Sequence, residues 1–175
     1  VFLEQVRQDQ PVEADVIEAM FLATQSDVAA AASKLERALL AFRLDPWPRP
    51  DLMERAILLS ERLASQDAAA APRLLEALGQ PFAVHQREAR RVLTRMNLSL
   101  SLDFERLCGA GLAPFEPHPP WTGPVLSARM QCYEKTHHPL ATRAREELDW
   151  YFAREPRSFG AGVVSSSGAE EQLRN

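Results

Sequence analysis

Hydrophobic residues recur every three or four positions in nearly every segment between prolines. The clearest stripe is Leu52, Ala56, Leu59 and Leu63, at spacings of four, three and four residues. This spacing places the four side chains on one face of a helix, which predicts an amphipathic helix packed on a neighbour. No segment shows the alternating pattern of β-branched and polar residues that is typical of a strand. The sequence therefore predicts an all-α protein.

Prolines and capping residues divide the chain into about eight predicted helices. Proline interrupts a helix interior but is accepted in the first turn and beyond the last. Ser26 or Asp27 is expected to cap one helix, Asp51 to open the next, and Gly79 to follow a helix end. The predicted helices begin near residues 12, 27, 51, 67, 84, 102, 124 and 139. We expect one helical repeat domain over residues 1–157 and a flexible, Gly- and Ser-rich tail over residues 158–175.

The helices group into pairs of nearly constant length. The leading helices of successive pairs begin near residues 13, 51, 84 and 121, so the intervals are 38, 33 and 37 residues. A period near 34 residues is typical of tetratricopeptide arrays, in which a helix pair that cannot bury its apolar face alone stacks on its neighbours. The spacing thus indicates stacked helix pairs.

Two segments resemble the second helix of a tetratricopeptide repeat. Ala31, Leu35, Ala38 and Pro46 resemble its series of small residue, bulky residue, Ala and Pro. A second, degenerate copy consists of residues 132–136 (Cys-Tyr-Glu-Lys-Thr) followed by Ala141, Ala144 and Pro156. The resemblance covers about half of the chain. It implies a short right-handed α-solenoid of antiparallel helix pairs, with an irregular helical bundle as the alternative.

Composition excludes several partners. The net charge of −4 provides no basic field for nucleic acid or an anionic membrane. The 18 Arg, 2 Lys and 26 Ala fit the coding bias of a GC-rich bacterial genome, so the arginines as a class indicate no partner. No stretch approaches the roughly 18 apolar residues of a membrane-spanning helix. We therefore expect a cytoplasmic protein without a membrane span, and nucleic acid is not an expected partner.

Candidate chemical sites are weak. Five possible zinc ligands lie within 31 residues, but none of their spacings is a recognised one. They are Cys108, His118, Cys132, His137 and His138. Cys108 and Cys132 are expected to be buried free thiols in a reducing compartment. We expect neither metal nor cofactor.

Catalysis is not expected either. Glu146, Glu147 and Asp149 lie beside Arg143 and Arg145, which is typical of a solvated, ion-paired helix face. No nucleophile motif is present. The sequence thus predicts no catalytic residue in this segment.

Two features are candidates for partner binding. Arg87, Arg91 and Arg95 follow one another at a spacing of four, so they share a helix face. They could bind an anionic partner, or pair with acidic residues of neighbouring helices. The segment 115–121, which ends at Trp121, either straps across its own core or docks a partner. Trp47 is expected to fill the junction of the first two helix pairs.

The leading functional hypothesis is a protein–protein interaction or scaffolding module without catalysis, because helical stacks present grooves to peptides. One alternative is a helical C-terminal appendage that braces or oligomerises a larger bacterial enzyme or membrane protein; the absence of an initiator Met and the predicted tail motivate it. The other alternative is a small metal-binding or enzymatic helical protein.

Overall fold

The computed structural model describes residues 2–154 and contains, within that range, nine α-helices and two short 3-10 turns. The all-α prediction is confirmed, and the predicted tail, residues 158–175, lies outside the described range. The helices are α1 (Phe2–Asp9), α2 (Pro11–Thr24), α3 (Val28–Ala41), α4 (Pro50–Gln66), α5 (Ala70–Ala77), α6 (Glu88–Leu102), α7 (Phe104–Leu112), α8 (Gly123–Lys135) and α9 (Ala141–Arg154). The turns are η1 (His85–Arg87) and η2 (Ala113–Phe115).

Local signals place most helix starts. Pro11 and Pro50 each occupy the first position of a helix, where the missing N–H costs no hydrogen bond. The carboxylate of Asp27 accepts the backbone N–H of Ala30 at 3.2 Å, which confirms the predicted cap. The structure adds α1, which the sequence did not predict because its eight residues contain no long apolar stripe.

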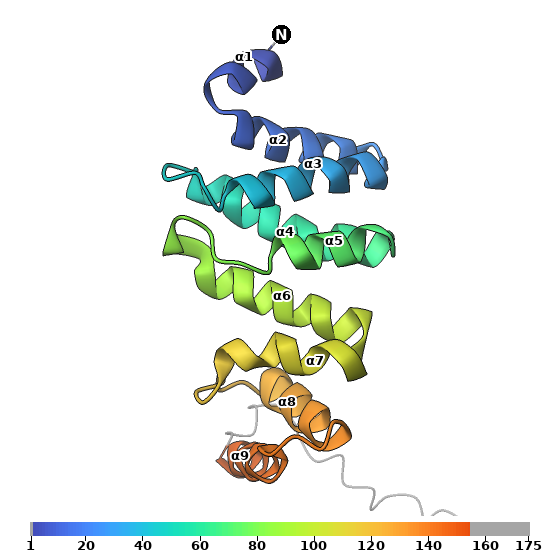
Figure 1. The fold of residues 1–175 in the computed structure, drawn as a ribbon, viewed down its shortest axis with the longest axis vertical. Helices are drawn as coiled ribbons and strands as arrows, with labels where there is room; N and C mark the ends of the chain where they lie inside the picture. The colour runs from blue at the N-terminus through green and yellow to red at the C-terminus, as the bar shows by residue number, and fades with distance from the viewer. Residues whose placement is uncertain (1, 155–175) are drawn as a thin grey trace, which may run out of the picture.

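Each helix packs against the next one along the chain, from α1 to α9 (Figure 1). In the first half, α4 also packs against α2 and α6, while α3 packs against α5. The helix α4 is therefore a direct neighbour of both α2 and α6, and α3 is a direct neighbour of α5. The pair α8/α9 meets the rest mainly through the contact of α8 with α7.

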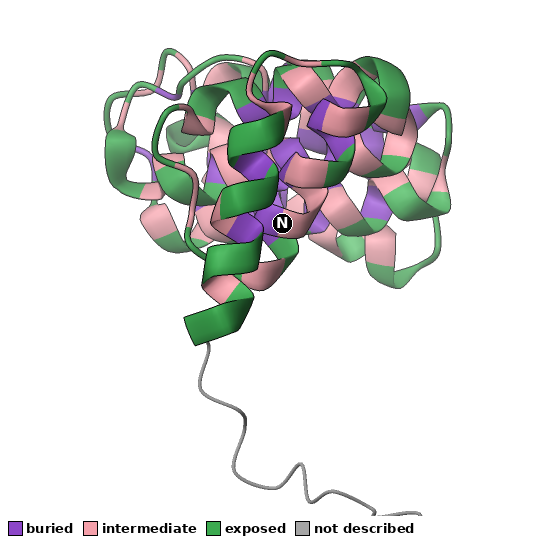
Figure 2. Ribbon diagram, turned by 90° about the horizontal axis from the view of Figure 1, so that it is seen from below, coloured by how far each residue is buried: buried purple, intermediate pink, exposed green. Residues whose placement is uncertain are grey.

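The buried hydrophobic residues form two clusters. The first lies between α2 and α6 and includes Leu35, Phe42 and Ile57, each fully buried. The second lies between α6 and α9 and is built around Cys108 and Tyr133. The two clusters meet at α6, which gives Leu98 to the first and Met96 to the second. Figure 2 shows the buried residues on the inner sides of the helices and the exposed ones outside.

The small residues of α7 permit a close approach to α6. A Cβ atom added at Gly111 would lie 2.9 Å from the Cβ of Ser99 and 3.3 Å from the Cα of Met96. This glycine therefore serves packing, and the helix continues past it to Leu112.

The two cysteines form a disulfide between α7 and α8. Cys108 and Cys132 are fully buried, and their Cα atoms are 5.9 Å apart. The expectation of free thiols is wrong, although their burial was predicted. The reason is that packing of α7 on α8 brings two positions 24 residues apart within bonding range.

A carboxylate of α2 holds α1 and α3. Asp15 accepts a hydrogen bond from Nη1 of Arg7 at 2.7 Å and is also bound by the guanidinium of Arg37. Glu18 accepts from Nζ of Lys34 at 2.8 Å and from Arg7. Burial raises the pKa of Asp15, but the hydrogen bonds from Arg37 and Arg7 outweigh it and hold the pKa below its ordinary value.

This lowered pKa predicts an acid-sensitive fold. A carboxyl whose pKa is lower in the folded than in the unfolded state stabilises the fold above its unfolded value of about 4, and loses that contribution as the pH falls through the folded value. The variant Asp15→Asn should therefore be less stable than wild type at pH 7, and the difference should shrink as the pH is lowered below about 4. Urea unfolding at pH 7 and at pH 3 measures it. Asp149→Asn, at an exposed position of α9, is the control, and parallel losses in wild type and Asp15→Asn would contradict the prediction.

Candidate functional site

The predicted arginine face is mostly engaged inside the fold. Arg91 is 4% exposed, and its guanidinium donates to a carbonyl of the α5 end and to a carboxylate of its own helix. Nη1 of Arg95 donates to a carbonyl of α7 at 3.2 Å, and Nε of Arg87 lies 3.0 Å from a carboxylate of α4. The hydrogen-bond acceptors are the carbonyl oxygens of Leu78 and Ala110 and the carboxylate of Glu88, whereas Glu54 forms an ion pair with Arg87. A shared partner-binding role for the three arginines stays a prediction.

The candidate metal ligands do not converge. Within residues 2–154, no three His, Cys, Asp or Glu side chains are placed to hold a metal ion. The two cysteines are bonded to each other, and His138 stacks on Tyr133 with ring centroids 4.1 Å apart. Nδ1 of His138 accepts the N–H of Leu140 at 3.2 Å, while His137 adopts a positive φ of 53° in the turn between α8 and α9.

The segment 115–121 is pinned to α8 and α9 by a buried ionic network. Arg129, 1% exposed, donates from Nε to Glu116 at 2.5 Å and from Nη1 to Glu147 at 2.6 Å. The hydroxyl of Tyr133 donates to Glu116 at 2.7 Å. Sequence reasoning missed Arg129, although a charge inside the apolar stripe of α8 was a usable signal.

The protonation states of Glu116 and Tyr133 are fixed near neutral pH. Burial raises the pKa of Glu116, but hydrogen bonds from Arg129 and Tyr133 outweigh it and keep that pKa below its ordinary value. Burial, together with the hydrogen bond to Glu116, raises the pKa of Tyr133 to about 12. At pH 7 the carboxylate is therefore charged and the phenol neutral, which suits holding the segment rather than proton transfer.

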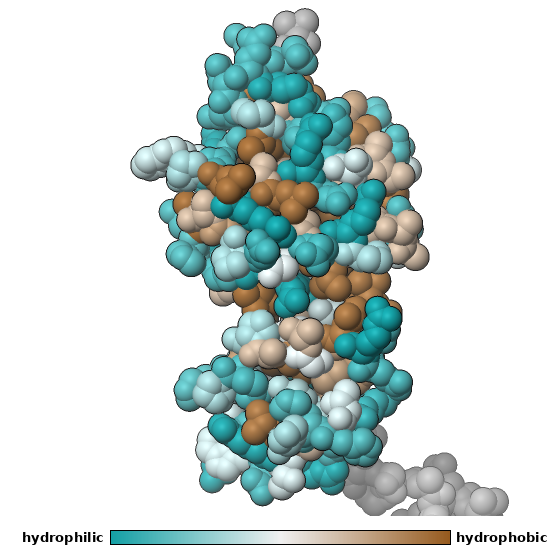
Figure 3. All heavy atoms as spheres, in the orientation of Figure 1, coloured by the Kyte–Doolittle hydropathy of each residue, from teal (hydrophilic) through white to brown (hydrophobic). Residues whose placement is uncertain are grey.

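The tryptophans stand at the surface. Trp47 is 87% exposed in the loop between α3 and α4, so the expectation that it fills the junction of two helix pairs is wrong. Trp121 is 45% exposed and meets the ring of Trp150 edge-on, with ring centroids 5.5 Å apart. On the face drawn in Figure 3, hydrophobic side chains likewise appear in separate groups between hydrophilic ones.

A hollow of about 400 Å³ lies between α2 and α4. Its lining residues are Met20, Arg55, Leu58, Leu59 and Arg62. The four residues from α4 follow the spacing of one helix face, and Leu58 remains 44% exposed. Neither arginine makes a side-chain hydrogen bond or ion pair with another described residue. The hollow thus combines an apolar floor with two uncompensated positive charges.

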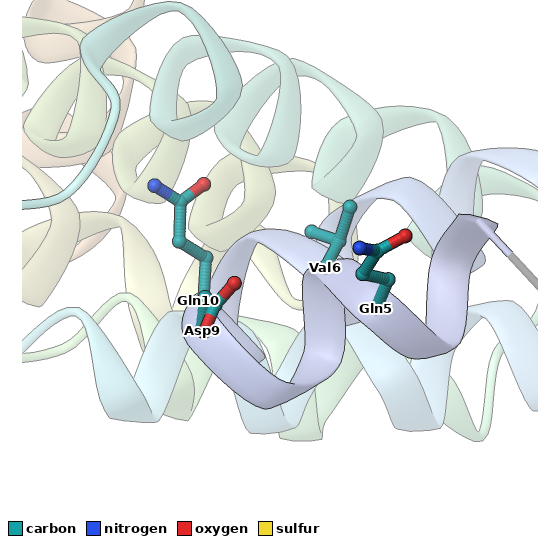
Figure 4. A pocket seen from close by; sticks show the side chains of 4 residues that line it. All are labelled: Gln5, Val6, Asp9 and Gln10. Carbon is teal, nitrogen blue, oxygen red and sulfur yellow. The ribbon is translucent and has the colours of Figure 1, made fainter.

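Two further hollows have different characters. One of about 300 Å³ lies between α4 and α6 and is lined by Glu54, Gln86, Arg87, Ala89, Arg90 and Leu93. The other, about 330 Å³, lies at the bend between α1 and α2, where Val6 is the sole apolar residue among the four that line it (Figure 4). Because Glu54 already pairs with Arg87 in the first of these and the second lacks an apolar floor, the hollow between α2 and α4 is the strongest candidate site of the three.

Comparisons of the chain with protein-family models, with curated proteins and with solved structures found no match. Among the described helices, none combines the length and hydropathy needed to cross a membrane.

Proposed function

We propose that the chain is a protein-interaction or scaffolding module that binds an acidic segment of a partner protein in the hollow between α2 and α4. The observation that carries the proposal is the pair of unpaired arginines, Arg55 and Arg62, beside an apolar floor. Exposed apolar side chains grouped with uncompensated charge are typical of interaction surfaces.

The geometry suggests the form of the bound segment. Arg55 and Arg62 are seven residues apart on α4, which separates them by about 10 Å along the helix axis. Leu58 and Leu59 lie between them and Met20 faces them from α2. A partner segment with an apolar side chain flanked by two carboxylates matches this pattern, since each guanidinium can bind a carboxylate through two hydrogen bonds.

The packing of the first half supports a tetratricopeptide-like stack. Among the leading helices α4 contacts both α2 and α6, and the second helices α3 and α5 contact each other. Such two-layer stacking is the arrangement of an α-solenoid, whose leading helices line an extended binding surface. We propose a short right-handed solenoid on this basis, and the irregular bundle remains the alternative.

The other hypotheses stay predictions. They are a helical appendage of a larger protein and a small metal-binding or enzymatic protein. A cytoplasmic location also stays a prediction, and the Cys108–Cys132 disulfide argues against it, because cytosolic proteins usually keep their thiols reduced.

Peptide display tests the proposed function and does not require an identified partner. A library of random peptides is selected on the wild-type chain and on the double variant Arg55→Glu/Arg62→Glu. The wild type should enrich peptides with Asp or Glu on both sides of an apolar residue. The double variant should lose at least ten-fold in affinity for these peptides, because two close charge pairs become repulsive.

The matched control is Arg106→Glu/Lys135→Glu, which changes the net charge by the same amount at exposed positions of α7 and α8. It should retain the wild-type peptides and affinities. Enrichment of peptides without acidic residues, or equal binding to the double variant and to wild type, would refute the proposed site.

A further inference from the structure

A second surface with the opposite charge preference lies on α9 and on the segment that precedes α8, at the end of the stack far from α1 (Figure 1). A pocket of about 310 Å³ opens there between Trp121 and Trp150. The two indole rings are inclined by 74°, and each side chain is close to half exposed. Glu146 and Glu147 complete the lining. The pocket is thus walled by aromatic rings and bordered by carboxylates.

One of these rings already carries a cation. The guanidinium carbon of Arg154 lies 4.1 Å from the centroid of the Trp150 ring. An indole face attracts a cation through its quadrupole, and a planar guanidinium can stack on it. This contact shows the kind of group that the aromatic wall accepts.

The two carboxylates differ in their availability. Glu147 is bound by the buried Arg129 and by Nε of Arg143 at 2.7 Å. Glu146 is exposed and makes no side-chain hydrogen bond or ion pair with another residue of the described range. The border of the pocket therefore has one uncompensated negative charge beside the two indoles.

We propose that this pocket binds an arginine side chain of a partner protein, stacked on one of the two indoles, bordered by the other, and paired with Glu146. Arginine fits better than lysine because its flat guanidinium can lie on an indole while it donates two hydrogen bonds to one carboxylate. The surface is separate from the hollow between α2 and α4 and has the opposite charge. Either site can therefore fail without the other.

Indole NMR tests the proposal, because the chain has three tryptophans in different settings. The blocked tripeptide Gly-Arg-Gly is titrated into the protein while the three indole N–H resonances are followed. The resonances of Trp121 and Trp150 should shift and saturate together. That of Trp47, in the loop between α3 and α4, should not move, and the tripeptide Gly-Lys-Gly should bind more weakly.

Three variants sharpen the test. Glu146→Gln should weaken binding of the arginine tripeptide about five-fold, as expected for loss of one exposed charge pair. Arg154→Ala should strengthen it, because the internal competitor for Trp150 is removed. Arg145→Ala is the control for Arg154→Ala. It also removes one positive charge from α9, but Arg145 pairs with Glu134. Equal shifts at Trp47, equal binding of the lysine tripeptide, or unchanged affinity in Glu146→Gln would each overturn the proposal.

Discussion

Replacement of Arg129 by Met is expected to lower the free energy of unfolding by about 3–5 kcal/mol. Its guanidinium is 1% exposed and pairs with both Glu116 and Glu147. Removal of the positive charge leaves two carboxylates with little access to water, and each loses the hydrogen bond that Arg129 donates to it. The segment 115–121 should loosen as a result.

Urea unfolding followed by circular dichroism at pH 7 measures this loss. The triple variant Arg129→Met/Glu116→Gln/Glu147→Gln should recover part of the stability, because no carboxylate then remains beside the missing guanidinium, and Arg143, which loses Glu147, is half exposed to water. The control Arg106→Met, at a side chain that is 82% exposed, should stay within about 0.5 kcal/mol of wild type. A change below about 1 kcal/mol for Arg129→Met would contradict the structural role of the network.

The second large effect concerns the disulfide. Replacement of both Cys108 and Cys132 by Ala should lower the free energy of unfolding by about 3 kcal/mol, because the unfolded chain loses a cross-link that closes a loop of about 24 residues. This bond joins α7 to α8, the contact through which the last helix pair meets the rest. Unfolding of the wild type with and without a reductant provides the measurement.

The reductant should destabilise the wild type by a similar amount and leave the double alanine variant unchanged. Equal stability of wild type with and without reductant, after mass spectrometry has verified reduction, would contradict the prediction. The mass of the non-reduced protein from its native source also tests the cytoplasmic location, because a persistent disulfide is typical of oxidising compartments.

The sequence predicted the helices whose buried residues recur every three or four positions. The stripe of Ala56, Leu59 and Leu63 is buried as its spacing required. The helix α1 could not be found in this way, since it is held by Arg7 on Asp15, a contact between charged residues in two helices. An apolar stripe identifies the buried face of one helix, whereas an ion pair between two helices depends on how those helices pack.

The candidate sites were harder to predict for the same reason. The spacing of Arg87, Arg91 and Arg95 placed them on one face, but it could not show that Arg91 reaches the carbonyl of Leu78. Conversely, no pattern in the sequence pointed to Arg62. Its side chain has no hydrogen-bond or ion-pair partner among the described residues, and this depends on how the helices pack. Whether an arginine is structural or available is decided by its neighbours in space.

The disulfide is a third feature that could not be predicted from the sequence. Cys108 and Cys132 were each predicted to be buried from their apolar surroundings, and both are. Their pairing depends on the register of α7 against α8, which no local pattern encodes. A separation of 24 residues is compatible with bonded and with free thiols alike.

The most direct test of the proposed interaction site is methyl NMR on the four methionines. Met20 lines the hollow between α2 and α4, while Met53 and Met96 are buried in the two clusters and serve as internal controls. A displayed peptide with acidic residues around an apolar one is titrated into protein with ¹³C-labelled methionine methyls. The proposed function predicts that the Met20 resonance shifts and saturates while those of Met53 and Met96 stay in place. Saturable binding that leaves Met20 unmoved would contradict it and place the partner elsewhere on the chain.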